Sequence, residues 1–298
     1  MDINKRFQKL LFVGGDRRQI RAVNRVAESG REVGVFGYDN TDADKFSERV
    51  CQDINLYEIK NEYKTIVLPL PYTLDGKFVN TMSDKIKIEI SELLQNFAKD
   101  SVILAGKCNR DFVKLAENKD FCIVDYFERE ELQILNAIPT AEGAIQIAMQ
   151  EVPFTIHSSK CLIIGNGRIG KILAKMLTGI GADVTVAARK SRDRATLFSF
   201  GVKGISTSEL YENIGRFDII FNTVPNLMID ADMLAKTSRN ALVVDLASVP
   251  GGVDFEAARK MGIKVIWALS LPGKVAPDTA GDIIGKTLLN ILDELEVK

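Results

Sequence analysis

Short apolar segments alternate with amphipathic helical patterns along this sequence, and the alternation runs through the chain twice. In the first half, an apolar run ends at Val13 before two glycines, and a helical pattern follows from Arg17 to Ser29. Apolar segments of this length, separated by helices, are typical of a parallel sheet covered by helices on both faces. The alternation therefore predicts an α/β fold with two parallel, doubly wound sheets. The predicted strands are 10–13, 31–39, 65–68, 101–106, 121–127, Lys160–Ile164, Asp183–Ala187, Ile219–Asn222, Ala241–Asp245 and Lys264–Trp267.

The chain has 298 residues, which is enough for two domains of ordinary size. Between the two halves, the helical pattern of residues 127–150 is interrupted by Pro139, after which Thr140 can cap a second helix. We place a helical hinge there and predict three parts. The parts are an N-terminal α/β domain for substrate and catalysis at 1–151, with hinge helices at 128–151, a Rossmann-like nucleotide-binding domain at 152–275, and a C-terminal helix at 276–298 that packs back across the hinge.

The second half carries the pattern "GNGRIG" between a predicted strand and a predicted helix. This is the setting that a G-x-G-x-x-G dinucleotide fingerprint requires. The first glycine permits a tight turn, the second lets a diphosphate approach the backbone, and the third allows the helix to pack closely on the strand. N–H groups at the helix start would then face the phosphates. The alternative is a glycine-rich turn without a ligand. We call 165–170 the cofactor turn, and its predicted cofactor-binding residues are Gly165, Asn166, Gly167, Arg168, Ile169 and Gly170.

The residues after the second strand of this half indicate which nucleotide binds. NAD sites usually carry an acidic residue there, which accepts a hydrogen bond from the ribose 2′-hydroxyl group. Here the segment 188–192, which we call the basic segment, contains Arg189, Lys190 and Arg192 and no acid. A guanidinium group can bind a 2′-phosphate dianion with two hydrogen bonds. We therefore predict NADP(H) as the cofactor, the alternative being a solvated basic turn.

Two further segments follow strands of the second half and should lie at the same edge of its sheet. The right-handed crossovers of such a fold place the carboxyl ends of parallel strands together, and ligands bind at that edge. The predicted cofactor-binding residues in these segments are Thr223, Val224, Pro225, Ala247 and Ser248. Asp245 either contributes to the same cleft or orients the local backbone.

Composition excludes several classes of function. The formal net charge of −1 gives no global field that would attract nucleic acid or an anionic membrane. No stretch approaches the roughly 18 apolar residues of a membrane-spanning helix. The four cysteines are scattered and indicate buried thiols in a reducing compartment, the alternative being disulfides or metal ligands. The first residues lack the pattern of a signal peptide, so we expect a soluble, cytoplasmic protein. The single histidine, His157, precedes a strand at its amino end, so we expect a structural role for it and no metal site.

Seven sequence blocks, taken together, resemble the family of the dipicolinate synthase A subunit. The blocks are "GGDRRQ" at 14–19, "IPTAEG" at 138–143, "TIHSSK" at 155–160, "GNGRIG" at 165–170, "FNTVPNLMI" at 221–229, "DLASVPGGVDF" at 245–255 and "LPGKVAPDTAG" at 271–281. They cover nearly the whole chain in order. Asn166 stands where family members commonly have leucine. The stretch "LAGKCNR" at 104–110 diverges, which leaves a substrate role for Lys107 or Asn109 unsupported.

The resemblance implies an NADP-linked oxidoreductase that works with a smaller, flavoprotein-like B subunit in the mother cell during sporulation. Together they would convert dihydrodipicolinate, a small dicarboxylate, into dipicolinate (pyridine-2,6-dicarboxylate). Loss of a hydride and a proton makes the ring aromatic, so the protein mainly has to align the ring, hold two carboxylates and accept a proton. We also expect copies of the chain to associate with one another.

The first half supplies the predicted substrate and catalytic residues. Arg18 with Gln19 follows the first strand and is the favoured carboxylate clamp, and Lys274 is a second candidate. The alternative is that Arg18 begins a solvated helix face. The nominated proton acceptors are Asp16 and Glu142, although Glu142 could equally be a capping carboxylate at a helix start.

Two other functions remain open at this point. One is a stand-alone reductase of the hydroxyacid type, but such enzymes usually place a histidine and an acid near the last strands, where "WALSLPGK" has neither. The other is a non-catalytic scaffold that binds NADP(H) while its partner performs the chemistry. The absence of an obvious acid–base pair from the sequence keeps this second alternative open.

Overall fold

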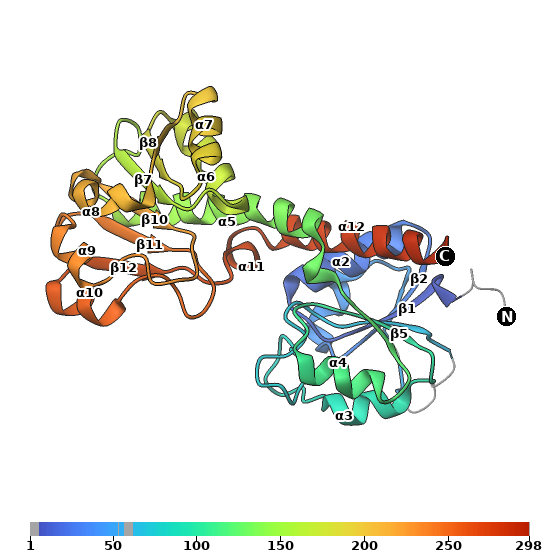
Figure 1. Cartoon of the computed structure of the whole chain (residues 1–298). Helices are drawn as coiled ribbons and strands as arrows, with labels where there is room; N and C mark the ends of the chain where they lie inside the picture. The colour runs from blue at the N-terminus through green and yellow to red at the C-terminus, as the bar shows by residue number, and fades with distance from the viewer. Residues whose placement is uncertain (1–5, 53, 57–61, 298) are drawn as a thin grey trace. The chain divides into compact units, whose positions relative to one another are not determined.

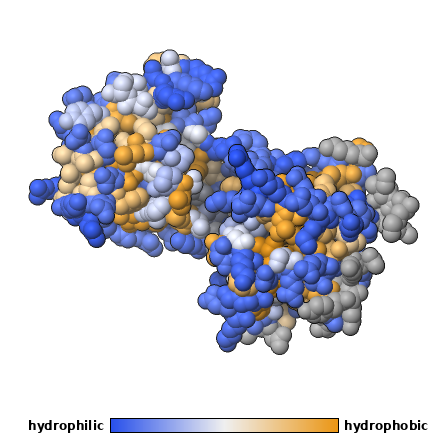
Figure 2. Space-filling view, turned by 60° about the horizontal axis from the view of Figure 1, so that its bottom comes forward, coloured by the Kyte–Doolittle hydropathy of each residue, from blue (hydrophilic) through white to orange (hydrophobic). Residues whose placement is uncertain are grey.

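The computed structural model describes residues 6–52, 54–56 and 62–297. The chain divides into two compact units, each with its own sheet (Figure 1). The first unit comprises Met1–Leu135 and Ala276–Lys298, and the second comprises Asn136–Val275. On the face seen in Figure 2, hydrophilic residues cover much of the surface of each unit, and hydrophobic residues are interspersed among them.

The first unit contains a parallel six-stranded sheet with the strand order β3-β2-β1-β4-β5-β6. Its strands are β1 (Lys9–Val13), β2 (Glu32–Phe36), β3 (Val50–Cys51), β4 (Thr65–Val67), β5 (Val102–Ala105) and β6 (Cys122–Asp125). Its helices are α2 (Arg17–Glu28), α3 (Ile90–Leu93), α4 (Arg110–Glu117) and α12 (Pro277–Glu296), with the 3-10 turns η1 (Asn40–Lys45), η2 (Leu94–Asn96) and η3 (Tyr126–Glu128). The central strands are buried on both faces, as the apolar runs predict.

The C-terminal helix α12 packs against α2 within the first unit (Figure 1). Two glycines allow the close approach of these helices. A Cβ atom at Gly281 would lie 2.4 Å from the carbonyl oxygen of Arg18, and one at Gly285 would lie 2.8 Å from Cβ of Arg25. Apolar side chains of α12, among them Leu288 and Leu292, complete the core on this face of the sheet. The last helix thus belongs to the first unit, although 140 residues of the other unit separate it in sequence from α2.

The second unit has the same architecture, with the strand order β12-β11-β10-β7-β8-β9 and all neighbouring pairs parallel. Its strands are β7 (Lys160–Ile164), β8 (Asp183–Ala187), β9 (Lys203–Ile205), β10 (Ile219–Asn222), β11 (Leu242–Asp245) and β12 (Lys264–Trp267). Its helices are α6 (Arg168–Ile180), α7 (Ser191–Ser199), α8 (Leu210–Asn213), α9 (Ala231–Lys236), α10 (Phe255–Met261) and α11 (Leu271–Val275), with the 3-10 turns η4 (Thr207–Glu209) and η5 (Ile214–Arg216).

Numbered along the chain, the strands of each sheet follow the order 3-2-1-4-5-6, which is the Rossmann order. Ligands of such sheets bind beyond the carboxyl ends of the strands, at the point where the strand order reverses. In the first unit that point lies between β1 and β4, and in the second it lies between β7 and β10. The predicted fold class, with two parallel doubly wound sheets, is confirmed.

One expectation about the connecting region is wrong. Helix α5 (Glu130–Glu151) is continuous, and Pro139 lies inside it. Thr140 does not cap a second helix, because its hydroxyl group donates a 2.8 Å hydrogen bond to the carbonyl of Asn136 in the preceding turn. The two units divide between Leu135 and Asn136, within this helix, and not near the predicted Val152. The reason is packing, since the second half of α5 contributes buried side chains to the core around β7 and α6; these are Ala141, Ala144, Ile145 and Ala148.

Candidate functional site

The cofactor turn connects β7 to α6, and the space around each of its three glycines explains why a glycine stands there. Gly165 has a φ angle of +104°, and a Cβ atom there would lie 2.4 Å from Oγ1 of Thr223. A Cβ atom on Gly170 would lie 2.1 Å from the carbonyl oxygen of Gly165, so the helix packs directly on the turn. No atom lies within 4 Å of the corresponding position at Gly167. The turn therefore has two glycines that close it and one that leaves space beside its backbone.

The space beside Gly167 lies at the start of α6. Gly167 is the N-cap residue, and no side chain caps the helix there. Main-chain N–H groups of the first turn thus face the open side, where they can bind an anion. These features fit the diphosphate of a nicotinamide dinucleotide, and the glycine roles are those that its fingerprint assigns.

The other residues of the cofactor turn differ in burial. Arg168 is exposed, while Ile169 packs partly against the core. Asn166 is half-buried, and its Oδ1 atom is buried without a hydrogen-bond partner in the described part of the chain. Among the turn's side chains, Asn166 is thus the one with a sheltered polar atom.

The basic segment lies beside the cofactor turn because β8 pairs with β7. The N–H group of Gly165 donates a 2.9 Å hydrogen bond to the carbonyl of Ala187, the last residue of β8. Directly after it, the side chains of Arg189, Lys190 and Arg192 are exposed. Three cations therefore stand at the end of the strand where an NAD site would carry an acid.

Arg194 also shapes the basic segment, a role that is not predicted from the sequence. Its Nη1 atom donates hydrogen bonds to the carbonyls of Ala188, at 2.9 Å, and Arg189, at 3.1 Å. Its guanidinium group therefore holds the backbone of the segment from the first turn of α7. A basic residue shortly after the segment is the one signal that could have pointed to it.

Thr223 fixes the start of the segment after β10. Its N–H and its hydroxyl group both donate to the carbonyl of Ile164, at 3.0 and 2.9 Å. This ties the segment to the end of β7 and places Thr223 against Gly165. Val224 follows partly buried, and Pro225 is exposed at the same edge.

Asp245 organises the loop after β11. Its side chain is fully buried and accepts hydrogen bonds from the N–H groups of Ala247, at 3.1 Å, and Gly252, at 2.8 Å. The side-chain amide of Asn222 donates a third, at 2.8 Å. Of the two roles considered for Asp245, the geometry supports the orientation of the local backbone.

The residues of the loop that Asp245 holds in place differ in burial. Ala247 is buried, and its carbonyl accepts a 2.9 Å hydrogen bond from Nε1 of Trp267. Ser248 is exposed. Val249 is 72% exposed, and Leu227 of the neighbouring loop is 63% exposed. The loops after β10 and β11 thus expose apolar side chains at the same edge of the second sheet as the cofactor turn, and ligand sites generally combine apolar lining with a few polar groups.

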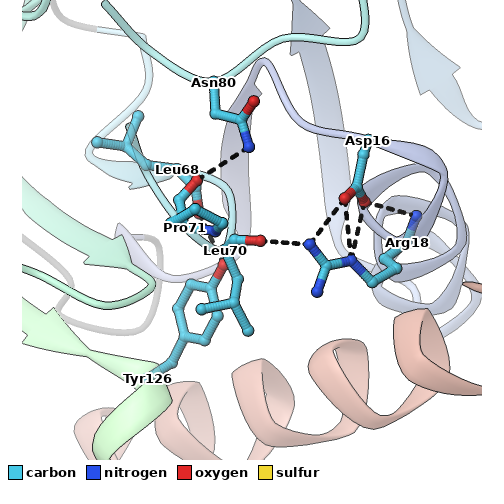
Figure 3. Close-up of polar contacts among 7 residues, drawn as sticks. All are labelled: Asp16, Arg18, Leu68, Leu70, Pro71, Asn80 and Tyr126. Carbon is cyan, nitrogen blue, oxygen red and sulfur yellow. Dashed lines mark hydrogen bonds and ion pairs between the residues drawn. The ribbon is translucent and has the colours of Figure 1, made fainter. Parts of the chain in front are cut away.

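The corresponding edge of the first unit holds an ion pair (Figure 3). Arg18 Nη2 lies 2.7 Å from Oδ2 of Asp16, and Nε lies 3.1 and 3.0 Å from the two carboxylate oxygens. Nη2 also donates to the carbonyl of Leu70, in the segment after β4. Asp16 is in addition the N-cap of α2, where it accepts the N–H of Arg18 at 2.9 Å. The guanidinium group is thus fixed on two sides.

Hydrogen bonds from side chains of other segments hold the segment that contains Leu70. The hydroxyl group of Tyr126 donates a 3.0 Å hydrogen bond to the carbonyl of Leu68. Burial raises the pKa of Tyr126 well above its ordinary value, so the hydroxyl group remains a donor. The side-chain amide of Asn80 lies 3.3 Å from the carbonyl of Pro71. The main-chain segment that accepts the hydrogen bond from Arg18 is therefore itself held in place by other hydrogen bonds.

The glycine turn of the first unit does not offer a second dinucleotide site. The N–H group of Gly15 donates to the carbonyl of Asn80 at 2.8 Å, and that of Gly14 donates to Phe36 at 2.8 Å. A Cβ atom at Gly14 would lie 2.7 Å from the carbonyl oxygen of Asn80. The segment around Asn80 thus covers the turn that in the second unit is open.

Several predicted substrate residues lie in unexpected places. Gln19 is 1% exposed, and its side chain lies against Gly15, so it faces the core. Its Nε2 atom has no hydrogen-bond partner among the described residues. Glu142 lies inside α5, not at a helix start, and lines a groove with Met176 and Ile180 in the second half of α6. That end of α6 is opposite the cofactor turn.

Two other residues to which the sequence draws attention are Lys274 and His157. Lys274 is exposed in the short helix α11. His157 is exposed before β7, at the amino end of the strand, where its ring lies against Gly181 and its Nδ1 atom lies 2.9 Å from the hydroxyl group of Ser158. It therefore stands at the sheet edge opposite the cofactor turn. Within the described ranges, no three His, Cys, Asp or Glu side chains gather in a way that could hold a metal ion, and none of the helices there has the length and apolar character needed to cross a bilayer.

Two family models match the chain. Residues 9–127 match the N-terminal domain of the dipicolinate synthase A subunit, and residues 146–267 match shikimate / quinate 5-dehydrogenase. The dipicolinate synthase A subunit of Bacillus subtilis is 33% identical over 292 residues, covering 97% of each chain. The crystal structure of the A chain of dipicolinate synthase from Bacillus subtilis superposes with a TM-score of 0.88, at 33% identity over 97% of each chain. That of the A subunit from Bacillus halodurans gives a TM-score of 0.87, at 31% identity over 95% of this chain and 97% of the other.

Proposed function

This chain belongs to the family of the dipicolinate synthase A subunit, and from that premise we propose that it is an NADP(H)-dependent oxidoreductase that converts dihydrodipicolinate into dipicolinate. The proposal includes a smaller, flavoprotein-like partner, the B subunit. It also places the reaction in the cytoplasm of the mother cell of a sporulating bacterium.

The observation that carries the cofactor assignment is the pairing of an open cofactor turn with the exposed basic segment. The space beside Gly167 and the uncapped start of α6 would hold the diphosphate. Arg189, Lys190 and Arg192 would then face the adenosine ribose, where a 2′-phosphate is bound by cations and an acid would repel it. Thr223, Val224, Pro225 and the loop ordered by Asp245 would border the nicotinamide end.

In the first unit, Arg18 is the residue proposed to bind a substrate carboxylate. Asp16 and the carbonyl of Leu70 fix its Nε and Nη2 atoms, while Nη1 makes no hydrogen bond with the described residues. Nη1 is therefore the atom that can donate to substrate. Because the guanidinium group is already oriented, little conformational entropy is lost when the carboxylate binds.

The reaction removes two electrons and two protons from the dihydropyridine ring. Bound NADP⁺ would accept one hydrogen with both electrons as a hydride, and the second hydrogen would leave as a proton. The product ring is aromatic, so the task of the chain is to hold the carboxylates and to align the ring. Asp16 serves in this scheme as a positioning residue for Arg18, because its carboxylate is engaged by that guanidinium group and by the N–H of residue 18.

An assay of the purified chain with and without the B subunit tests the proposal. Freshly prepared dihydrodipicolinate and NADP⁺ should give dipicolinate and NADPH when both subunits are present, and NADP(H) should bind to the chain alone. If the chain binds no NADP(H) in titration calorimetry, the cofactor assignment fails. If nucleotide binds but no dipicolinate forms with both subunits, the substrate assignment fails.

One observation favours a second function, that of a nucleotide-binding subunit whose partner carries out the proton transfer. Of the two nominated proton acceptors, Asp16 is engaged by Arg18, and Glu142 lies by the second half of α6. The same assay, repeated with an Arg18→Ala variant of the chain, separates the two functions. The non-catalytic alternative predicts that NADPH formation depends on the active site of the partner and survives replacement of Arg18.

A further inference from the structure

A loop at the carboxyl end of β5 has an unusual backbone. Lys107 adopts a left-handed conformation with a φ angle of +62°, which residues other than glycine, asparagine and aspartate seldom adopt. The conformation is held by Asp125, whose carboxylate accepts the N–H groups of Lys107, at 3.0 Å, and Cys108, at 2.6 Å. A strained backbone that neighbours hold in place is typical of functional sites.

The same loop lies next to the segment that holds Arg18. The N–H of Gly106 donates to the carbonyl of Pro69 at 3.1 Å, and the N–H of Tyr72 donates to the carbonyl of Gly106 at 2.9 Å. A Cβ atom at Gly106 would lie 2.9 Å from Cα of Leu70. Leu70 is the residue whose carbonyl accepts the hydrogen bond from Arg18 (Figure 3). Leu70 therefore lies between the Arg18 guanidinium group, which donates to its carbonyl, and Gly106, the residue that precedes Lys107.

The charges around this loop leave Lys107 available to an anion. Its side chain is exposed, and among the described residues it has no ion-pair partner. Of the nearby carboxylates, Asp125 is engaged by main-chain N–H groups and Asp16 by Arg18. Asp111 and Glu128 also lie near the loop, where their charges act on Tyr72 and Cys108. Strands β1, β4 and β5 are neighbours in one parallel sheet, so Arg18 and Lys107 stand at the same edge, on both sides of the point where the strand order reverses.

We propose that Lys107 is the second cation of a two-point clamp for a planar dicarboxylate, with one carboxylate on Arg18 and the other on Lys107. This inference rests on the proposed function and adds a residue to its site. Asp125 acts as the positioning residue, because its two hydrogen bonds fix the backbone from which the lysine side chain extends. The class of ligand is a rigid ring with two carboxylates, since a single carboxylate would need only one of the cations.

Binding of two stable probes to the full chain tests the clamp. Dipicolinate has two carboxylates and picolinate has one, and each can be titrated calorimetrically in the presence of NADP⁺. Lys107→Met should weaken dipicolinate about tenfold or more, since hydrogen bonds to charged groups contribute about 1.5–3 kcal/mol. Picolinate, which Arg18 would hold alone, should lose less than twofold.

Two further variants make the result specific. Lys107→Gly also removes the cation but suits the left-handed backbone, so it should weaken dipicolinate to the same extent while its thermal unfolding temperature is at least that of the wild type. Lys114→Met removes an exposed lysine of α4 and is the matched control, with unchanged affinity expected.

The outcomes separate this inference from the proposed function. Selective loss of dipicolinate affinity in both Lys107 variants supports the clamp. Equal affinity of the wild type and both Lys107 variants for dipicolinate overturns the clamp and leaves the proposed function standing. An equal loss in Lys114→Met also overturns it, because the effect would then come from surface charge in general. If the wild type binds neither probe, the substrate assignment and the clamp fail together.

Discussion

Gly170 of helix α6 lies so close to Gly165 that a Cβ atom on Gly170 would stand 2.1 Å from the carbonyl oxygen of Gly165. This contact determines how the start of α6 sits on the end of β7, and hence where its uncapped N–H groups point. The position of the helix, and not an individual side chain, is therefore what a substitution at residue 170 would change.

We expect Gly170→Ala to displace the start of α6 and to weaken NADP(H) binding at least tenfold. Overpacking of this kind also lowers the free energy of unfolding, by about 1–3 kcal/mol. Gly179→Ala, in the same helix, is a matched control, because no atom lies within 4 Å of its Cβ position. This control should raise the free energy of unfolding by about 0.5–1 kcal/mol and leave binding unchanged. Calorimetric titration and denaturant unfolding measure both effects, and intact binding in Gly170→Ala would contradict the proposed site.

Charge reversal in the basic segment tests the nucleotide preference. Arg189→Glu should weaken NADP(H) by about 10- to 100-fold, the range expected for the loss of charge-assisted hydrogen bonds, and leave NAD(H) affinity within about twofold of the wild type. Dissociation constants for both nucleotides at fixed ionic strength give the comparison. Lys175→Glu, an exposed position on α6, introduces the same charge change away from the segment. Equal losses for both nucleotides would show that Arg189 does not face a 2′-phosphate.

Asp245 provides a test of the loop after β11. Asp245→Asn puts an amide group where two main-chain N–H groups now donate, so at least one buried donor loses its acceptor. The expected cost is about 1–3 kcal/mol in the free energy of unfolding, together with weaker nucleotide binding as the loop shifts. Asp254→Asn is the control, since Asp254 caps α10 and asparagine caps a helix equally well. Unchanged stability of Asp245→Asn would mean that the loop does not depend on this carboxylate.

Much of the fold follows from the sequence because the strands are apolar runs with polar ends. The bounds of β7, β8, β10 and β12 are as predicted, whereas the short strands β3 and β9 were not predicted. Strand β9 begins with Lys203 and lies at the sheet edge, and two or three residues give too little periodicity to detect. The break expected at Pro139 fails because packing of the following turns outweighs one lost main-chain hydrogen bond.

The site was less predictable than the fold. The roles of Gly165, Gly167 and Gly170 depend on their spacing along the chain, so they could be predicted from the sequence. Gln19 is predicted at the substrate site from its residue type, whereas its spacing of four residues from Val23 and seven from Val26 places it on the buried face of α2. The contacts of Arg18 with Leu70 and of Arg194 with Ala188 involve backbone carbonyls. Such partners carry no residue-type signal, so a sequence pattern could not reveal these contacts, although the basic character of Arg194 just after the basic segment could have indicated a role for it.

Arg18 should act on substrate and not on nucleotide. Arg18→Ala is expected to raise KM for dihydrodipicolinate about 10- to 100-fold, the effect of removing a hydrogen bond to a charged group, with NADP(H) affinity unchanged. Arg17→Ala, its exposed neighbour, is the control and should behave as the wild type. Steady-state kinetics with both subunits and titration of the nucleotide supply the two readouts. A wild-type KM in Arg18→Ala would remove this residue from the clamp.

The buried thiol of Cys161 in β7 predicts a dependence of stability on pH. Burial raises its pKa from 9.0 to about 11, although a contact with the Ser159 hydroxyl group lowers it. The native state therefore retains the thiol proton between these values, while the unfolded state releases it. The unfolded state binds fewer protons in this range, so the thiol's contribution to the free energy of unfolding falls as the pH rises from about 9 to about 11.

Cys161→Ala removes this contribution, so its difference in free energy of unfolding from the wild type should shrink as the pH rises. Denaturant unfolding at about pH 8 and about pH 10.5 measures the difference, which should fall by about 1–2 kcal/mol, because one pKa unit corresponds to about 1.4 kcal/mol. Cys122→Ala is the control for the loss of a thiol, at a position in β6 that is exposed and not buried as expected, and it is measured at the same two pH values. If the Cys161→Ala difference stays constant, the thiol titrates alike in both states and burial does not control its proton.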